Sequence, residues 1–376
     1  RENFRSAYLY TETGELLQEI EFDGDIDEIV GETKTGFICE VYSENGLYKS
    51  VFHVNLETGK KIRLSEADGY YGARYLKNND VVLIDGFSNS MMRIQKLVSV
   101  QSADSKTLLK EESLLKDYES GQTEIINIEA EDGTLLNARI IKPSNFDPSK
   151  KYPIINYVYG GPGVQQVNAS FNYQSRLWMN YMASRGYIIW TLDNRGSSNR
   201  GKIFEQKTFR NLGKVELEDQ LSGIDYLKSQ PWVYTTRMGV FRWSFGGFMT
   251  LNMMLKTPGI FKVGVAGGPV TNWSFYEVMY TERYMDTPEQ NEDGFKSTDL
   301  LPYAANLEGD LLIIHGGMDN VVLPKHSMRL LREFIKNNKQ VDFFMYPTHE
   351  HNVVGKDRLH LITKVLNYLE ESLSDE

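Results

Sequence analysis

Ser244 has the surroundings of an activated nucleophile. It ends a short apolar run, residues 240–243, and is followed by Phe245, two glycines and a helix-like stretch, residues 248–254. This order predicts a nucleophile elbow, a sharp turn between a strand and a helix that exposes the serine hydroxyl above a sheet. A serine held in this way performs acyl transfer through a covalent acyl-enzyme.

A serine is a weak nucleophile until a histidine removes its proton and a carboxylate orients that histidine. Asp319 follows an expected strand at residues 311–315, and a further expected strand leads into the loop 347–352. That loop contains two of the six histidines of the chain, His349 and His351. The order serine, aspartate, histidine is that of α/β-hydrolases. The residues alone leave both loop histidines open as the base.

The acyl transition state also needs hydrogen-bond donors for its oxyanion. The elbow itself supplies the backbone N–H of Phe245. Tyr159 is the predicted second donor, because it follows an expected strand and precedes a glycine-rich loop, residues 160–163, that lets the backbone pass close to the serine. The alternative is a tyrosine that only fills the core.

Composition limits the class of protein. The chain has 376 residues, of which 41% are hydrophobic, enough for two domains with substantial cores. The sequence contains no stretch of about 18 uncharged apolar residues, so no membrane span is predicted. The net charge is −10 and the basic residues are scattered, which argues against a nucleic-acid partner. Because the chain begins at Arg1 rather than at methionine, we expect a fragment or a processed product.

Neither a metal nor an organic cofactor is predicted. The histidine pair at 349 and 351 has no third ligand nearby, and no glycine-rich loop leads into a phosphate-binding unit. The single cysteine, Cys39, excludes an intrachain disulfide. It lies within a strand-like run, residues 36–42, which favours a buried small side chain over a nucleophile.

The two halves of the chain differ in their patterns. Residues 1–115 alternate short apolar runs with turns, which predicts a partial β-propeller of about two blades. Residues 116–376 alternate buried strands with amphipathic helices, which predicts an α/β-hydrolase domain with a mainly parallel sheet. A hairpin is expected at residues 125–142. The expected strands are 154–158, 188–192, 238–243, 263–266, 311–315 and 343–346, and the expected helices are 174–185, 215–230, 326–337 and 357–373.

Several motifs of the second half resemble one family. They are residues 158–162, 193–197, 216–220, 243–247, 280–285 and 346–353. Together they resemble the prolyl oligopeptidase family of serine peptidases, its dipeptidyl peptidase IV branch, and most closely the bacterial prolyl tripeptidyl peptidases. In that family the base lies five residues after the tyrosine of the last motif. The resemblance therefore implies that His351, and not His349, is the base.

The resemblance also implies a pocket for proline. At the matching positions the chain has flat or apolar side chains that suit a pyrrolidine ring, namely Phe245, Val270, Trp273, Tyr276, Tyr280 and Val322. Glu277 stands where a tripeptidyl member holds the α-amino group of its substrate. The implied substrates are peptides with proline near the N-terminus, cleaved to release di- or tripeptides. The family further implies a homodimer that acts in the periplasm or after export.

Two positions depart from the family pattern. Arg242 replaces the elbow glycine two residues before the serine, where a large side chain could tilt the nucleophile or fill the pocket. Val321 replaces an asparagine that helps to hold the substrate carbonyl. Two alternatives to a prolyl exopeptidase follow. One is an acylaminoacyl peptidase or esterase of the same fold, and the other is a catalytically silent peptide-binding homologue.

Overall fold

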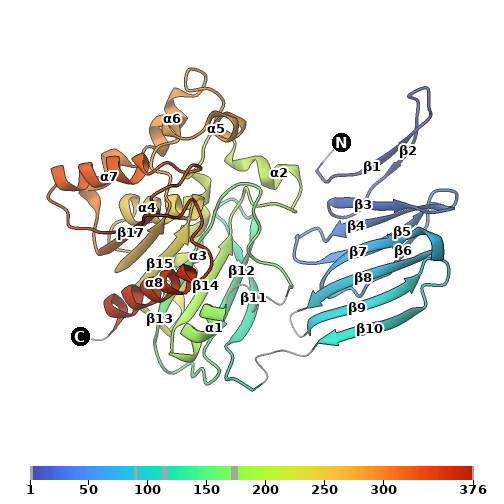
Figure 1. The fold of residues 1–376 in the computed structure, drawn as a ribbon, viewed down its shortest axis with the longest axis horizontal. Coiled ribbons are helices and arrows are strands. Elements are labelled where there is room, and N and C mark those ends of the chain that lie inside the picture. Colours follow the sequence, from blue (N-terminus) through green and yellow to red (C-terminus); the bar gives the residue numbers. More distant parts are fainter. Residues whose placement is uncertain (1–2, 89–90, 112–116, 171–176, 375–376) are drawn as a thin grey trace. The chain divides into compact units, whose positions relative to one another are not determined.

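The computed structural model describes residues 3–88, 91–111, 117–170 and 177–374 (Figure 1). The chain divides into two compact units. The first comprises residues 1–119, 167–177 and 197–205, and the second comprises residues 120–166, 178–196 and 206–376. The predicted domain boundary after residue 115 and the start of the predicted helix at 174–176 lie outside the described residues. None of the described helices is long and apolar enough to cross a membrane.

The first unit is built mainly of antiparallel β-strands. In each of two four-stranded groups, β3–β6 and β7–β10, strands that are consecutive in the chain pair antiparallel. The parallel pairing of Lys49 in β5 with Tyr70 in β7 joins the two groups. This arrangement is consistent with two propeller blades, as the sequence predicts. The strands are β1 (Ala7–Tyr10), β2 (Leu16–Ile20), β3 (Ile26–Glu32), β4 (Gly36–Tyr42), β5 (Lys49–Asn55), β6 (Lys61–Arg63), β7 (Tyr70–Leu76), β8 (Val81–Ser88), β9 (Met91–Ser99) and β10 (Ser105–Glu111), with a short 3-10 helix, η1 (Lys77–Asn79).

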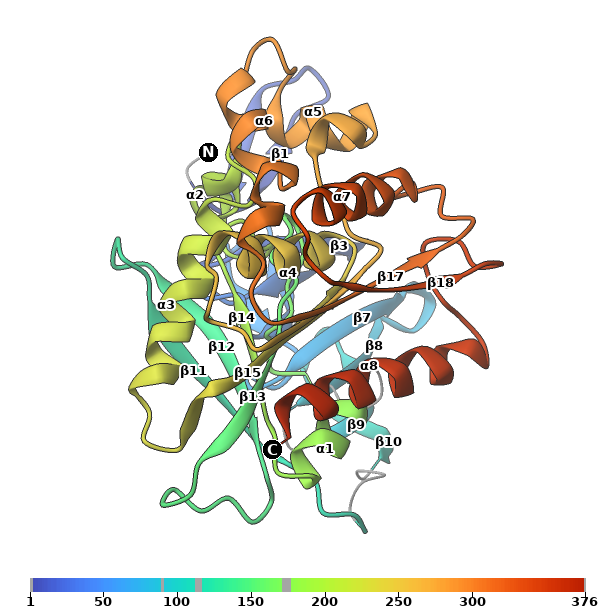
Figure 2. The same ribbon diagram turned by 90° about the vertical axis from the view of Figure 1, so that its left-hand side faces the viewer.

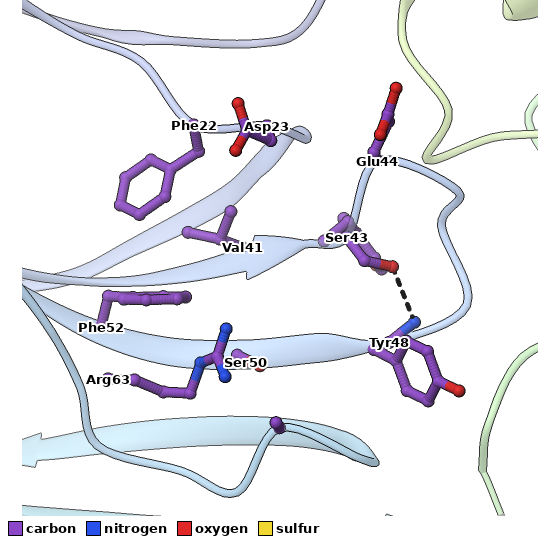
Figure 3. A pocket seen from close by; sticks show the side chains of 11 residues that line it. Phe22, Asp23, Val41, Ser43, Glu44, Tyr48, Ser50, Phe52 and Arg63 are labelled. Carbon is purple, nitrogen blue, oxygen red and sulfur yellow. Dashed lines mark hydrogen bonds between the residues drawn. The ribbon is translucent and has the colours of Figure 1, made fainter.

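An open pocket of about 320 Å³ lies along β4 and β5 of this unit (Figure 3). Phe22, Val41 and Phe52 form its apolar wall, and Arg63 stacks on the Phe52 ring. Asp23 and Glu44 add carboxylates at its rim, so the pocket offers charges of both signs. Cys39 is fully buried in β4, and burial raises the pKa of its thiol to about 12. The cysteine is therefore an inert core residue, as its sequence surroundings predict.

The second unit contains an eight-stranded sheet in the order β11-β12-β14-β13-β15-β16-β17-β18. β11 and β12 form the predicted hairpin, β12 pairs antiparallel with β14, and the remaining pairs are parallel. The predicted α/β-hydrolase sheet is thus confirmed. Its strands are β11 (Gln122–Glu129), β12 (Leu135–Lys142), β13 (Tyr152–Tyr157), β14 (Ile188–Asp193), β15 (Val233–Trp243), β16 (Val263–Gly267), β17 (Asp310–Gly316) and β18 (Asp342–Tyr346).

Helices cover both faces of this sheet (Figure 2). α1 and α8 pack on one face through a cluster that includes Met182, Val365 and Leu369. α3 and α4 cover the other face, where Tyr226 of α3 stacks on Trp190 and Met254 of α4 packs on β16. The helices are α1 (Leu177–Ser184), α2 (Lys202–Glu205), α3 (Val215–Ser229), α4 (Phe245–Lys256), α5 (Val278–Met285), α6 (Glu292–Thr298), α7 (Lys325–Lys336) and α8 (Asp357–Leu373), with 3-10 turns η2 (Gln206–Thr208), η3 (Trp273–Phe275) and η4 (Leu301–Asn306).

Glu216, in the first turn of α3, is a fully buried acid that the motif analysis does not assign to catalysis. Its Oε2 accepts the N–H of Gly213, at 2.9 Å, while its Oε1 has no hydrogen-bond partner among the described residues. Asn252 of α4 donates to the carbonyl of the same glycine, at 2.6 Å, and its own Oδ1 is also buried without a partner there. Burial raises the pKa of Glu216 to about 8.

Glu216→Gln is expected to stabilise the protein at alkaline pH. The folded state keeps the Glu216 proton up to about pH 8, whereas the unfolded chain loses it near pH 4.3, so wild-type stability falls as pH rises between these values. Glutamine has no charge to bury. The thermal unfolding midpoint of the variant should match that of wild type at pH 4, below the unfolded pKa, and exceed it at pH 9 by on the order of several degrees. An equal difference at both pH values would contradict the raised pKa.

Candidate active site

Ser244 occupies the turn between β15 and α4. Its backbone has φ 63° and ψ −125°, a left-handed conformation that a non-glycine residue adopts only where the surrounding structure enforces it. The Ser244 N–H donates to the carbonyl of Gly267, at 2.8 Å, and the Ser244 carbonyl accepts from Phe248 in α4, at 3.0 Å. Two ordinary hydrogen bonds thus hold the strained residue in place. This is the geometry of a nucleophile elbow.

Asp319 lies just beyond β17 and is almost fully buried. Its Oδ1 accepts the backbone N–H groups of Val321, at 2.9 Å, and Val322, at 2.8 Å. Its Oδ2 lies 2.8 Å from Nδ1 of His351. Burial alone would raise its pKa, but hydrogen bonds from His315 and His351 hold the pKa of this carboxyl well below its usual range. Asp319 therefore stays ionised at neutral pH, with Oδ2 facing the His351 imidazole.

His351 lies next to the elbow. The indole N–H of Trp243 donates to the His351 carbonyl, at 2.6 Å. The imidazole Cε1 lies 3.4 Å from the point where a Cβ on Gly268 would be, and the neighbouring Gly267 is the residue that holds the Ser244 N–H. A larger residue at 268 would be strained by its φ of 45° and would crowd the ring. The imidazole and the serine thus flank the same two glycines.

His349 has a different partner. Its Nε2 lies 2.8 Å from Oδ2 of Asp357, at the start of α8. The structure therefore brings His351, and not His349, to Asp319.

His315 contacts the aspartate as well, and the sequence patterns do not reveal it. The ring is fully buried, and its Nε2 lies 2.7 Å from the Val322 carbonyl and 3.4 Å from Oδ2 of Asp319. Its Nδ1 lies 2.7 Å from the hydroxyl of Ser327 in α7. Because Nε2 faces two oxygen acceptors, it is assigned the proton. The signal in the sequence is a histidine and an aspartate four residues apart across a Gly-Gly turn.

Five aromatic rings gather beside the serine and are called the aromatic cluster below. Trp273 is its centre, with ring centroids 5.3 Å from Phe245, 5.5 Å from Tyr276 and 5.8 Å from Tyr280. Tyr280 is stacked on Trp273, whereas Tyr276 meets it edge to face. Tyr159 joins the cluster through Phe245, at 6.2 Å. The aromatic side chains predicted for the oxyanion site and the pocket therefore form one continuous set.

The two valines predicted for the pocket are also buried. Val270 is 1% exposed and follows the Gly267–Gly268 turn, and Val322 is fully buried beside Asp319. Neighbouring Val321 is 44% exposed, and its side chain offers no hydrogen bond to a ligand. Within the described residues, no group of three histidine, cysteine, aspartate or glutamate side chains is arranged to hold a metal ion.

Tyr159 is half-buried at the start of the glycine-rich loop. Burial, together with the nearby Tyr284, raises the pKa of its phenol above the ordinary value. The phenol therefore keeps its proton at neutral pH, as a hydrogen-bond donor must.

Glu277 is exposed and caps the N-terminus of α5. Its two carboxylate oxygens accept the N–H groups of Met279, at 2.8 Å, and Tyr280, at 2.7 Å. A carboxylate at this position satisfies unpaired N–H groups and interacts favourably with the helix dipole. The cap also fixes Tyr280, so Glu277 contributes to the shape of the aromatic cluster.

Arg242 leaves the elbow intact. Its guanidinium lies over the rings of Tyr157 and Tyr159, and its Nη2 donates to Oε1 of Gln166, at 3.3 Å. The side chain therefore runs toward the loop 159–166. Ser244 keeps the elbow conformation, so the large residue neither removes the turn nor occupies the centre of the aromatic cluster.

Comparisons with known proteins agree with this geometry. The sequence model described as "Prolyl oligopeptidase family" matches residues 173–376, more than half of the chain. Dipeptidyl peptidase 8 of Mus musculus is 37% identical over 272 residues, which cover 71% of this chain and 30% of the relative. A probable dipeptidyl-aminopeptidase B of Botryotinia fuckeliana is 32% identical over 337 residues, which cover 86% of this chain and 36% of that protein.

Two crystal structures show the same fold along nearly the whole chain. A putative dipeptidyl aminopeptidase IV of Bacteroides ovatus is 39% identical, with a TM-score of 0.90 over 98% of this chain and 54% of that one. The dipeptidyl peptidase 4 of Porphyromonas gingivalis is 30% identical, with a TM-score of 0.91 over 98% of this chain and 53% of its own. This chain thus spans about half the length of the two solved structures and about a third of the length of the two curated relatives.

Proposed function

This chain belongs to the prolyl oligopeptidase family of serine peptidases, and from that premise we propose that the full-length protein releases N-terminal di- or tripeptides by cleaving after proline. One observation carries the proposal. The 2.8 Å pair between Asp319 and His351 lies beside a strained serine elbow and next to the aromatic cluster. A base, its orienting carboxylate, a nucleophile and a flat apolar surface are the components that such cleavage requires.

The reaction proceeds in two halves. His351 removes the proton of Ser244 as the hydroxyl oxygen attacks the scissile carbonyl, and Asp319 stabilises the resulting imidazolium. The oxyanion accepts hydrogen bonds from the Phe245 N–H and the Tyr159 phenol. The imidazolium then protonates the leaving amine, and the acyl-enzyme remains. Water hydrolyses it by the same steps, with His351 again as the base.

The proline preference follows from the shape and polarity of the aromatic cluster. A pyrrolidine ring is flat, compact and without a charge, so it can lie against Trp273, Tyr276 and Tyr280 without a polar partner. A charged side chain at the same position would be desolvated and left unpaired, at a cost of several kcal/mol. Glu277 supports recognition of an α-amino group, since it is an exposed carboxylate next to the cluster.

Chromogenic substrates test the proposal. The full-length protein should release the chromophore from Xaa-Pro or Xaa-Xaa-Pro derivatives, and the ratio of the two kcat/KM values decides between dipeptide and tripeptide release. Acetylated amino acids or short esters that are turned over faster than both would overturn it in favour of an acylaminoacyl peptidase or esterase. A folded protein that turns over none of them would overturn it in favour of a silent homologue.

Tyr276→Ala is expected to weaken the preference for proline. Removal of one aromatic wall should lower kcat/KM for prolyl substrates by roughly 10- to 100-fold and for alanyl substrates by less, because alanine contacts that wall less. The preference is measured as the ratio of the two kcat/KM values. Tyr181→Ala is the matched control, since this tyrosine is exposed on α1. Equal losses for both substrates would show that Tyr276 does not set specificity.

Family membership also supports two further proposals. We propose that the full-length protein is a homodimer and that it is periplasmic or exported. Light scattering of the full-length protein and fractionation of the cells that make it test them. A monomer at micromolar concentration, or recovery with the cytosol, would overturn the respective proposal.

A further inference from the structure

Arg242 stands two residues before the serine, where the family pattern has glycine. A Cβ on Gly246 would lie 2.0 Å from Cγ of Arg242, so the arginine stem occupies the space above the first turn of α4. The stem thus packs on the helix that begins at the nucleophile. Because residue 246 is glycine, the bulk at 242 is accommodated without displacing the elbow.

The charged end of Arg242 meets the segment that carries the predicted oxyanion donor. The guanidinium carbon lies 4.2 Å from the ring centroid of Tyr157 and 5.2 Å from that of Tyr159. Its Nη2 donates to Oε1 of Gln166, at 3.3 Å. The backbone N–H of Gln166 is held by both carboxylate oxygens of Asp193, at 2.9 and 3.0 Å. One side chain thus links the elbow to both ends of the loop 159–166.

The electrostatics of Arg242 are unusual for a structural arginine. Burial and the nearby Arg358 lower its pKa to about 10, which still leaves it positively charged at neutral pH. Among the described residues no carboxylate is paired with it, and its Nε is buried without an acceptor there. Two tyrosine faces take the place of an anion, which is a cation–π arrangement. A buried cation without a counterion is costly.

We propose that Arg242 is a positioning residue that holds Tyr159 in place as the second oxyanion donor. The proposal rests on the proposed function, because it assumes that Tyr159 donates to the oxyanion. The guanidinium of Arg242 lies over the Tyr159 ring, and the ring centroid of Phe245 lies 6.2 Å from that of Tyr159. Without the cation, the ring and its loop would sample other orientations. The loss would appear in the transition state, where the oxyanion forms, and little in substrate binding.

A double-mutant cycle tests this inference in the full-length protein. Arg242→Met keeps a stem of similar length and removes the charge, and Tyr159→Phe removes the donor. Arg242→Met alone should lower kcat about 10- to 30-fold with KM changed by less than about 2-fold. In the Tyr159→Phe background, Arg242→Met should lower kcat by less than about 2-fold, because the hydroxyl that Arg242 positions is already absent. Arg242→Lys should recover part of kcat, since the cation over the rings is restored.

Arg185→Met is the matched control. This exposed arginine also lies over a tyrosine ring, with its guanidinium carbon 5.6 Å from the ring centroid of Tyr181. It follows α1 and donates to Glu370 of α8, and these two helices pack on the opposite face of the sheet from α4. Its kcat and KM should equal those of wild type. Thermal unfolding of each variant verifies folding. If Arg242→Met is too unstable to assay, Arg242→Lys enters the cycle in its place, with a smaller but equally non-additive loss expected.

Three results would overturn the inference. These are an equal loss from Arg242→Met with and without the Tyr159 phenol, a change in KM alone, and a gain in kcat from Arg242→Gly. The cycle is also run with a short p-nitrophenyl ester, which needs the oxyanion donors but no proline pocket. Turnover of the ester without turnover of prolyl peptides would overturn the proposed specificity. The cycle measured with the ester would still test the role of Arg242.

Discussion

Ser244→Ala should abolish peptide and ester turnover by the full-length protein, with kcat lowered by roughly 10⁵- to 10⁶-fold and the fold unchanged. The reason lies in the elbow. Alanine can keep the same hydrogen bonds, from its N–H to Gly267 and from Phe248 to its carbonyl, so only the nucleophilic oxygen is lost. The measurements are steady-state kinetics and covalent labelling by a fluorophosphonate probe, which requires the same hydroxyl.

Ser274→Ala provides the control. Ser274 is an exposed serine in η3, next to the aromatic cluster, so a probe that reacts with accessible serines near the site would also detect it. Labelling and turnover should survive this change. Turnover that persists in Ser244→Ala at more than about one hundredth of wild type would show that another group is the nucleophile.

Most of the parallel strands were predictable because they are buried on both faces, as β13, β14, β16 and β17 are. The expected strand at 263–266 differs from β16 by one residue at one end, and that at 311–315 differs from β17 by one residue at each end, since continuous apolar runs mark such strands clearly. β15 is longer than the expected 238–243, because its first residues, from Val233, include several exposed polar side chains. An apolar run therefore locates the centre of a strand better than its ends.

α5 was not predicted, and its surface position explains why. Val278 and Met279 at its start are 55% and 74% exposed, so the apolar residues do not fall on a single buried face. The available signal was Glu277, whose carboxylate caps the helix. The sequence motif assigned that residue to substrate binding instead. The cap is what the structure adds to that prediction, and a carboxylate that caps a helix is still able to face a ligand.

Motifs predict which residues act in a reaction, but they do not show which neighbouring residues hold those residues in place. Ser244, Asp319 and His351 follow from their order and from the ends of the strands that carry them. The contact of His315 with Asp319 depends on Ser327, twelve residues further along in α7, which fixes the ring. Arg242 likewise could not be oriented from sequence, since its direction depends on Gly246 and on two tyrosines from another strand and its loop.

Asp319→Asn is expected to lower kcat by roughly 10³- to 10⁴-fold while KM changes little. The local hydrogen bonds give the reason. Oδ1 of this side chain accepts two backbone N–H groups, from Val321 and Val322, so an asparagine must place its oxygen there and turn its NH₂ toward His351. The Nδ1 of His351 would then accept a hydrogen bond from this NH₂ group rather than donate one. Its Nε2 would carry the proton, and the ring could no longer act as the base toward Ser244.

The pH dependence separates this loss of orientation from a loss of folding. Because the pKa of Asp319 is held low in the folded protein, its ionised form stabilises the fold above the unfolded pKa, near 3.9, and this contribution disappears as pH falls below that value. Asp319→Asn should therefore lack the wild-type decrease in unfolding temperature attributable to this group below about pH 4. The matched control is Asp357→Asn, which removes the partner of His349 and should leave kcat within about 2-fold of wild type. If the two asparagine variants lost activity equally, His349 would have as strong a claim to be the base as His351, and the pairing seen at Asp319 would not identify the catalytic imidazole.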